Sequence, residues 1–187
     1  MKNIARWSLM RNSSSENVQE HSHMVAVIAH ALAVIRRDIF GADSDPGAVA
    51  IAALFHDASE IFTGDMPTPV KYFDPGIMTA YKKVEAIASR KLLNALPAQM
   101  RPAYEPALAP PQTSPEHVLV KAADALAAYI KCLEELRAGN QEFSKAAEQS
   151  RSKLDAMALR EVDYFIDRFI PAFELSLDEL DFGFSQN

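Results

Sequence analysis

Apolar residues recur along this chain at three- and four-residue intervals, the spacing of amphipathic helices, and no useful length of strand-like alternation interrupts them. Between Glu16 and Ile39 the apolar positions follow a period of about 3.6 residues, and Gly41 marks the end of the pattern. Cap and breaker residues divide the rest of the chain into further helices. The predicted segments are residues 16–39, 46–62, 75–96, 97–107, 114–139, 141–157 and 160–169. We therefore expect an all-α fold, a bundle of about six to eight helices.

The second predicted helix carries the densest group of ionisable residues. An acidic cap and Pro46 in the first turn start it, and its apolar pattern continues unbroken through residue 62. On a continuous helix Glu60, four residues after His56, lies on roughly the same face. The two prolines and the glycine of Thr63–Pro69 then predict a rigid, non-helical loop beside Glu60.

Two further local patterns carry predictions about caps and packing. Ser13–Ser15 are expected to cap the first helix, with Glu16 as a negative charge at its positive end. The helix over residues 75–96 is expected to turn one apolar stripe inward, formed by Ile77, Tyr81, Val84, Ile87, Ala88 and Leu92.

Composition narrows the class of protein. A length of 187 residues favours a single domain over residues 1–187, with a loose acidic tail from about residue 178. Cys132 is the only cysteine, which excludes an internal disulfide and favours a reducing compartment. The net charge of −6 argues against a nucleic-acid polymer as partner. Because the apolar runs are too short to span a bilayer and no leader-like segment is apparent, we expect a cytoplasmic protein with no membrane partner.

Four side chains on three predicted helices form a candidate metal site: His21, His56, Asp57 and Asp124. Imidazole nitrogens and carboxylate oxygens are both ligands for divalent ions. Asp124 stands in an alanine-rich helix, where a buried carboxylate is costly unless it is paired or bound to a metal. A plain partner such as Lys121 or Arg36 remains an alternative for Asp124. Histidines are more often core or surface residues than ligands, and we assign that role to His23, His30 and His117.

Three neighbouring features each have a structural and a functional interpretation. Arg6-Trp7 is either a terminal anchor on the bundle or a planar fork for phosphate with a flat wall beside it. The segment Asp65–Pro69 is either a helix stop or a pocket wall. Glu60 is either solvated or a group that orients a ligand or transfers a proton.

The order of one histidine, a His-Asp pair and a later aspartate on a helical chain resembles the HD-domain metal-dependent phosphohydrolases. Longer motifs narrow the resemblance to the YfbR-type 5′-deoxynucleotidases, and it runs from near the first residue to Leu177-Asp178-Glu179. These motifs are Arg6-Trp7, Glu16–Ser22, His56–Glu60, Thr63–Phe73, Lys121–Leu126 and Lys131–Leu136. The histidine and aspartate skeleton alone is moderately specific, whereas the loop Gly64–Phe73 together with the Arg-Trp pair is much more so.

The resemblance implies an HD-domain helical bundle that forms a cytoplasmic homodimer. It also implies hydrolysis of deoxyribonucleoside 5′-monophosphates to deoxynucleoside and phosphate, with ribonucleotides excluded. Carried over by position, the ligands of one divalent ion are His21, His56, Asp57 and Asp124. Cobalt, manganese or copper is the expected ion, and zinc and magnesium are alternatives.

The resemblance also assigns roles around the metal. Arg6 is expected to orient the phosphate, and Trp7 to crowd the place of a 2′-hydroxyl. Glu60 or Asp65 is expected to handle a proton in catalysis. Substrate contacts are expected from Arg6, Trp7, His21, Asp57, Asp65, Met66, Pro67, Thr68 and Asp124.

Two alternatives remain open. One is an HD-domain hydrolase of another nucleotide, a triphosphate or a cyclic nucleotide, although the small size and the lack of a dense basic cluster favour a monophosphate. The other is a non-catalytic helical dimerisation module with a vestigial metal. All candidate ligands are present in the sequence, which argues against that second alternative.

Overall fold

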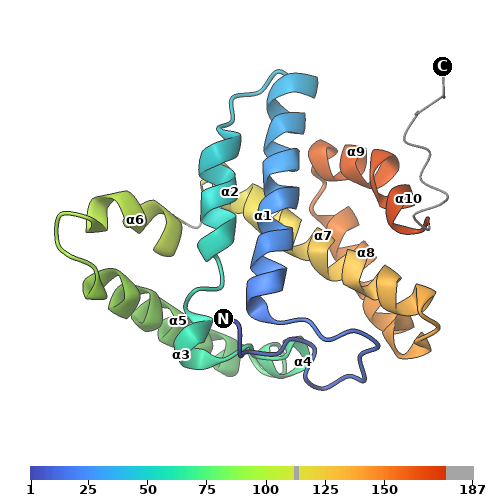
Figure 1. The fold of residues 1–187 in the computed structure, drawn as a ribbon, viewed down its shortest axis with the longest axis horizontal. Helices are drawn as coiled ribbons and strands as arrows, with labels where there is room; N and C mark the ends of the chain where they lie inside the picture. The colour runs from blue at the N-terminus through green and yellow to red at the C-terminus, as the bar shows by residue number, and fades with distance from the viewer. Residues whose placement is uncertain (112–113, 176–187) are drawn as a thin grey trace, which may run out of the picture.

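The computed structural model of the chain describes residues 1–111 and 114–175. Its described residues form a single all-helical domain, as predicted (Figure 1). The α-helices are α1 (Val18–Val34), α2 (Pro46–Phe55), α3 (Glu60–Thr63), α4 (Thr68–Lys71), α5 (Pro75–Ala95), α6 (Arg101–Leu108), α7 (Pro115–Arg137), α8 (Ser144–Ala156), α9 (Arg160–Arg168) and α10 (Ile170–Phe173). The tail predicted to be loose from about residue 178 lies outside the described residues.

The core lies where α1, α2 and α7 pack against one another (Figure 1). Helix α7 contributes a run of small buried side chains to this contact, including Ala122, Ala123 and Ala125. Small side chains allow helix axes to approach closely. Leu32 and Leu126, both fully buried, fill the space between the helices. The first half of α1 is therefore held directly beside the middle of α7.

Helix α1 begins at Val18, two residues later than predicted. Its N-cap is Asn17, whose side chain accepts hydrogen bonds from the N–H groups of Gln19 and Glu20, and Glu20 completes a capping box. The prediction that Ser13–Ser15 cap the helix is wrong, because these residues belong to a segment that folds across α7 instead. The helix continues as a π-helical turn to Ile39, close to the predicted end.

The second predicted helix is not continuous. Helix α2 ends at Phe55, and α3 begins only at Glu60. Between them the N–H groups of His56, Ala58 and Glu60 donate to carbonyls three residues back, which tightens the chain into turns. The following loop also departs from prediction, since Thr68–Lys71 form the short helix α4. Pro69 is tolerated there because it lies in the first turn.

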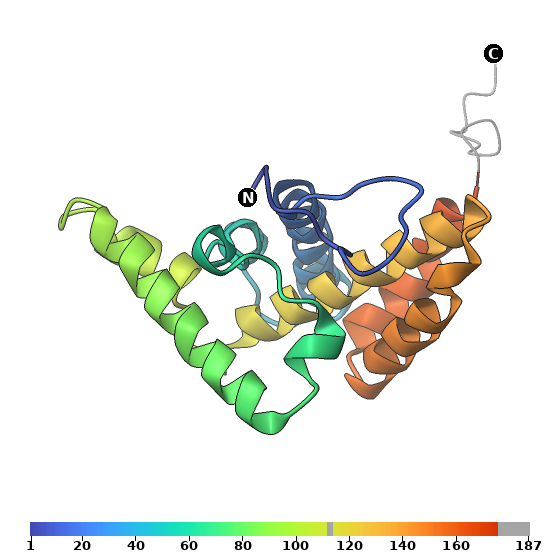
Figure 2. The same ribbon diagram turned by 90° about the horizontal axis from the view of Figure 1, so that it is seen from below.

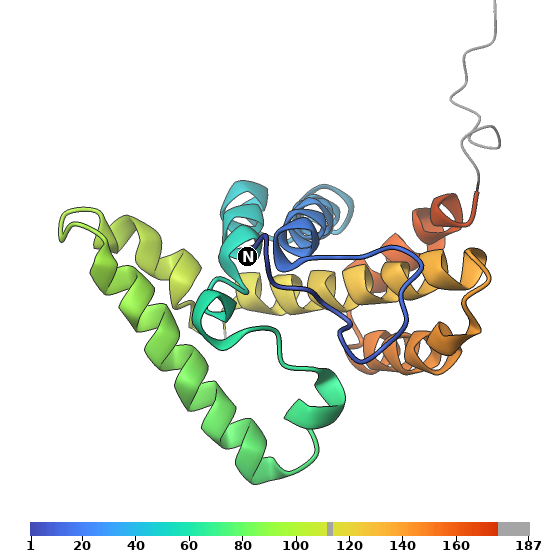
Figure 3. The same cartoon turned by 60° about the horizontal axis from the view of Figure 1, so that its bottom comes forward.

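Helices α5 and α6 extend to one side of the core as an arm, which Figures 2 and 3 show most clearly. Helix α5 packs on α6 and on the short helices α3 and α4. Of its predicted inward stripe only Tyr81 and Ala88 are buried. Val84 is 48% exposed and Ile87 is 58% exposed, so the prediction of a single inward stripe is wrong. The arm leaves a second apolar stripe on the surface.

The remaining differences from prediction are shifts of helix boundaries. Helix α6 spans Arg101–Leu108 rather than residues 97–107, and a 3₁₀ turn at Gln141–Phe143 precedes α8. Ser114 caps α7 as predicted. None of the described helices is both long enough and apolar enough to cross a membrane.

Candidate metal centre

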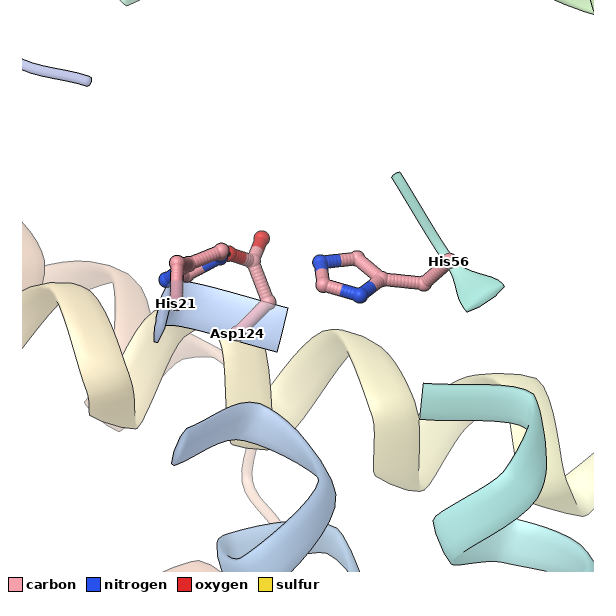
Figure 4. Close-up of side chains that lie close together, drawn as sticks. All are labelled: His21, His56 and Asp124. Atoms are coloured by element: carbon pink, nitrogen blue, oxygen red, sulfur yellow. The ribbon is translucent and has the colours of Figure 1, made fainter. Parts of the chain in front are cut away.

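Two histidines and an aspartate from three separate segments meet at one point (Figure 4). His21 comes from the first turn of α1, His56 from the turn after α2, and Asp124 from the middle of α7. One potential ligand atom from each lies within 4.8 Å of the others. Nε2 of His21 is 3.1 Å from Oδ1 of Asp124, so Asp124 pairs with His21 rather than with Lys121 or Arg36.

Asp57 completes the cluster as its second carboxylate. Its Oδ2 lies 3.0 Å from Nε2 of His56 and 3.7 Å from Nε2 of His21. Nη1 of Arg6 lies 3.6 Å from the same oxygen. The structure therefore brings together all four residues that the sequence analysis grouped, with a guanidinium at their edge.

The orientation of His56 suits a metal ligand. Its Nδ1 lies 2.7 Å from the carbonyl oxygen of Ala53, which takes a hydrogen bond from that nitrogen and leaves Nε2 to face the cluster. Nε2 is buried and has no partner with hydrogen-bonding geometry. The break between α2 and α3 makes this orientation possible, since the tight turn carries the ring and the carboxylate of Asp57 to the same side. Two imidazole nitrogens and two carboxylate oxygens form a donor set that fits a divalent ion.

Charge and burial act against each other on these groups. Burial lowers the pKa of His56, but the neighbouring charge of Asp57 outweighs it and raises the pKa to about 9. Burial raises the pKa of Asp124, but the hydrogen bond and charge of His21 outweigh it and hold that pKa below its usual range. The cluster therefore keeps its carboxylates ionised, as metal binding requires, and an ion bound by His56 would displace the proton of that imidazole.

Glu60 and Asp65 are the other carboxyl groups that act on the centre. Glu60 is buried, its Oε2 has no hydrogen-bond partner, and burial together with the charges of Asp57 and Asp65 raises its pKa to about 8. Burial likewise raises the pKa of Asp65, although the charge of Arg6 opposes the shift. The prediction that Glu60 lies on one continuous helix with His56 is wrong, but the side chain of Glu60 is buried close to these charges.

The predicted nucleotide-contacting loop follows α3. Met66 and Pro67 are half-buried, directly after Asp65, and Thr68 is exposed at the start of α4. Within the described residues, no side-chain hydrogen bond joins these three to the cluster. Their predicted role in binding substrate therefore stays a prediction.

Glu16 holds Arg6 and Trp7 in place. Its Oε2 accepts hydrogen bonds from Nε of Arg6 at 3.0 Å and from Nε1 of Trp7 at 3.1 Å. Glu16 was predicted only as a negative charge at the helix start, and its contacts with Arg6 and Trp7 were not predicted. Its spacing of nine and ten residues from the Arg-Trp pair gave no periodic signal, because the intervening chain loops out and returns.

The sequence of the whole chain can now be compared with those of known proteins. A family model described as "5′-deoxynucleotidase YfbR-like" matches residues 1–173. A curated 5′-deoxynucleotidase from Vibrio cholerae is 50% identical over 181 residues, which cover 96% of this chain and 93% of that protein. The chain belongs to the YfbR-like 5′-deoxynucleotidase family. Membership confirms the predicted family and the predicted enzyme class, a hydrolase.

Solved structures agree with this family's helical fold. An HD-domain phosphohydrolase from Listeria innocua aligns with a TM-score of 0.77 at 24% identity, over 91% of this chain and 83% of that one. The HD phosphohydrolase of cyanophage S-2L, bound to dA and one catalytic Zn²⁺, aligns with a TM-score of 0.57 at 21% identity, over 90% of this chain and 91% of that one. These likenesses confirm the HD-domain bundle predicted from the sequence.

The remaining histidines lie apart from the centre in this member of the YfbR-like family. His23 and His30 are exposed on α1, on the side away from Asp124. His117 lies in the first turn of α7, two helical turns before Asp124. None of the three belongs to the cluster of metal-ligating groups found among the described residues.

Proposed function

We propose that this chain hydrolyses deoxyribonucleoside 5′-monophosphates to deoxynucleoside and phosphate and excludes ribonucleotides. One observation carries the proposal: two imidazoles and two carboxylates converge beside the charged guanidinium of Arg6. The names of the family and of its curated relatives support the same reaction.

The proposed cofactor is one divalent ion held by His21, His56, Asp57 and Asp124. Bound there, the ion supplies Lewis-acid chemistry, which withdraws charge from a phosphoryl oxygen and lowers the pKa of water. Nε2 of His56, which faces Asp57 without hydrogen-bonding geometry, and the mixed nitrogen and oxygen donor set support this assignment. The two imidazoles favour cobalt, copper or zinc over magnesium, and the two carboxylates suit manganese, the other ion proposed. The cyanophage enzyme, which has the same fold, contains a catalytic Zn²⁺.

The chain's own groups then bind the phosphate and move a proton. Arg6 presents N–H donors that its bond to Glu16 leaves free, and a guanidinium fork matches phosphate oxygens. Glu60 carries a proton at neutral pH when its pKa is near 8, and Oε2 of its carboxyl group can give that proton to the departing 5′-oxygen. The carboxylate of Asp65 helps to keep Glu60 protonated, because two neighbouring negative charges repel.

A phosphate-release screen tests the proposed function. Deoxy- and ribonucleoside monophosphates, dATP and cyclic AMP are compared with cobalt, manganese, copper, zinc and magnesium. We expect release from the deoxymonophosphates alone, and only with a divalent ion present. Release from dATP or cyclic AMP instead would favour the other HD hydrolases. If no nucleotide released phosphate, the alternative of a non-catalytic dimerisation module would be favoured.

Replacing Trp7 by alanine is expected to raise AMP hydrolysis relative to dAMP by about tenfold or more. The indole of Trp7 and the guanidinium of Arg6 share the carboxylate of Glu16, so the ring is held on the same segment as the phosphate-binding group. Acceptance or exclusion of one small substrate group changes the ratio of the two rates by roughly 10–200-fold. Initial rates on AMP and dAMP measure the ratio. Leu9→Ala is the matched control, since Leu9 lies nearby on the same segment and is 64% exposed. An unchanged ratio in Trp7→Ala would contradict the role of Trp7.

The proposal includes a homodimer in the cytoplasm, joined through α5. Ile77, Ala80, Val84 and Ile87 are exposed along this helix at alternating three- and four-residue spacing, the pattern of a helix-pairing seam. A second copy offers the same stripe, and a two-fold axis would match the two. The buried free thiol of Cys132 is consistent with a reducing compartment.

A Val84→Glu/Ile87→Glu variant is expected to be a monomer, because two carboxylates per chain would have to be buried in the seam. Sedimentation velocity at micromolar concentration measures the change, and circular dichroism checks the fold. Lys82→Glu is the control, since Lys82 is exposed on the same helix outside the stripe. A wild-type monomer, or a variant that remains dimeric, would rule out this interface.

A further inference from the structure

Residues 5–17 form a closed loop, the N-terminal strap. The strap's ends are joined at its base: the N–H of Arg6 donates to the carbonyl of Glu16 at 2.9 Å, and the N–H of Val18 donates to the carbonyl of Ile4 at 3.0 Å. The base adjoins the first turn of α1, which carries His21. From there the strap crosses α7 and returns (Figures 2 and 3). Arg6 and Trp7 therefore lie at the base of the strap, beside the metal centre, while the far end of the strap lies over α7.

A buried ion pair on α7 holds the strap at its far end. Glu135 is 1% exposed and Lys131, one turn before it, is 5% exposed. The carboxylate of Glu135 accepts the backbone N–H groups of Ser13 at 2.8 Å and Ser14 at 3.1 Å. Nζ of Lys131 donates to the carbonyl of Ser14 at 2.6 Å and to Glu135. The pair thus binds the strap through its backbone.

Further contacts hold the strap between its far end and Trp7. Asn140 donates one side-chain hydrogen bond to the carbonyl of Arg11 and another to Glu135. The ring of Trp7 packs on Phe143, with ring centroids 5.3 Å apart. The backbone φ of Trp7 is +57°, a left-handed conformation that a bulky residue rarely adopts unless its surroundings impose it.

An ion pair in this place is not explained by stability alone. Apolar side chains of similar volume usually stabilise a buried site as well as an ion pair does. Apolar side chains could not accept the two N–H groups of the strap, which would be left without partners. Helix α7 also carries Asp124, 11 residues before Glu135 and so about 16 Å along one rigid helix. One element therefore positions both the metal centre and the strap.

We propose that Lys131 and Glu135 are positioning residues for substrate recognition: they clamp the strap and so fix Arg6 beside Asp57 and Trp7 on the carboxylate of Glu16 that it shares with Arg6. This inference rests on the proposed roles of Arg6 and Trp7 in binding deoxynucleotides. Neither Lys131 nor Glu135 touches the reacting atoms. Their removal changes substrate binding and sugar discrimination and leaves metal binding intact.

The test is the double variant Lys131→Met/Glu135→Leu, which removes both charges together and leaves neither unpaired. We expect the KM for dAMP to rise at least tenfold and the preference for dAMP over AMP to fall at least tenfold. Mn²⁺ affinity, measured by calorimetry, should stay within about twofold of wild type. Trp7 is the only tryptophan, so its emission reports the strap directly and should shift to the red and quench more readily. Trypsin should cleave faster after Arg6 and Arg11.

The matched control is Arg36→Met/Glu161→Leu. This second ion pair is also largely buried, with Nε and Oε1 2.7 Å apart, but it joins the end of the first helix to α9 and does not contact the strap. It should change stability without changing sugar discrimination or Trp7 emission. If the first double variant cannot be purified, Glu135→Gln gives a second test: its amide oxygen can still accept one strap N–H but its nitrogen cannot accept the other, so smaller changes in the same directions are expected.

The outcomes separate the clamp from the proposed function. A double variant whose Trp7 emission and protease sensitivity match wild type overturns the clamp, whatever the substrate. A strap that loosens without any change in KM or sugar discrimination overturns the positioning role. Wild-type protein that releases no phosphate from any deoxynucleotide overturns the proposed function instead, and emission and proteolysis still report on the clamp.

Discussion

An Asp124→Ala enzyme is expected to lose divalent-ion binding and at least about 1,000-fold of its dAMP turnover. The change removes one of two carboxylates in the cluster and leaves Nε2 of His21 without the partner that lies 3.1 Å away. Loss of a group that only orients a metal ligand typically lowers metal affinity or activity by about 10–100-fold, and loss of a ligand itself should lower them further. Metal content after dialysis and initial rates on dAMP measure the two effects.

Thermal unfolding gives a second measurement of the same change. An ion that binds only the folded state stabilises it by about 2.7 kcal/mol at 100 times its dissociation constant. Added Mn²⁺ should therefore raise the Tm of wild type and leave that of Asp124→Ala unchanged. Asp155→Ala is the control, since Asp155 is an exposed aspartate on α8, paired with Arg151. A full complement of metal and normal turnover in Asp124→Ala would refute the assignment of Asp124 as a ligand.

The parts of the fold that could be predicted are those determined by interactions between residues close together in the sequence. The proline-led start of α2 after Asp45 and the Ser114 cap of α7 lie as expected, because each cap binds backbone groups two or three residues away. The four clustered side chains were grouped by residue type and by their place on separate helices. That grouping needed no contact information, because ionisable side chains in apolar helical segments are costly to bury unless they are paired or bind a metal.

The parts that failed depend on contacts between distant segments. The break after Phe55 consists of the turns at residues 56–59, and the apolar residues on both sides of it continue a helical spacing, so periodicity could not detect it. The apolar pattern of residues 75–96 showed that α5 is amphipathic, but it did not show which of the apolar residues pack against the rest of the domain. Glu16 reaches Arg6 and Trp7 only because the strap closes, and the strap closes on Glu135, more than 120 residues along the chain from Ser13.

Arg6→Ala is expected to lower kcat/KM for dAMP by about 100- to 1,000-fold, the range found when a single donor to developing charge is removed. Arg6 is the guanidinium closest to the cluster, with Nη1 3.6 Å from Asp57, and the charges of Asp124 and Glu16 outweigh burial to raise its pKa. Arg6→Lys should recover only part of the loss, because an ammonium keeps the charge but not the planar fork.

The two site variants should affect metal binding in opposite ways. Removal of the positive charge beside Asp57 lowers the repulsion that an incoming cation meets, so Arg6→Ala should bind Mn²⁺ at least as tightly as wild type. Arg11→Ala, an exposed arginine on the same strap, should keep wild-type kinetics. Calorimetry with Mn²⁺ and steady-state rates on dAMP make the comparison. If Arg6→Ala lost both metal affinity and turnover, Arg6 would support the metal centre rather than bind phosphate.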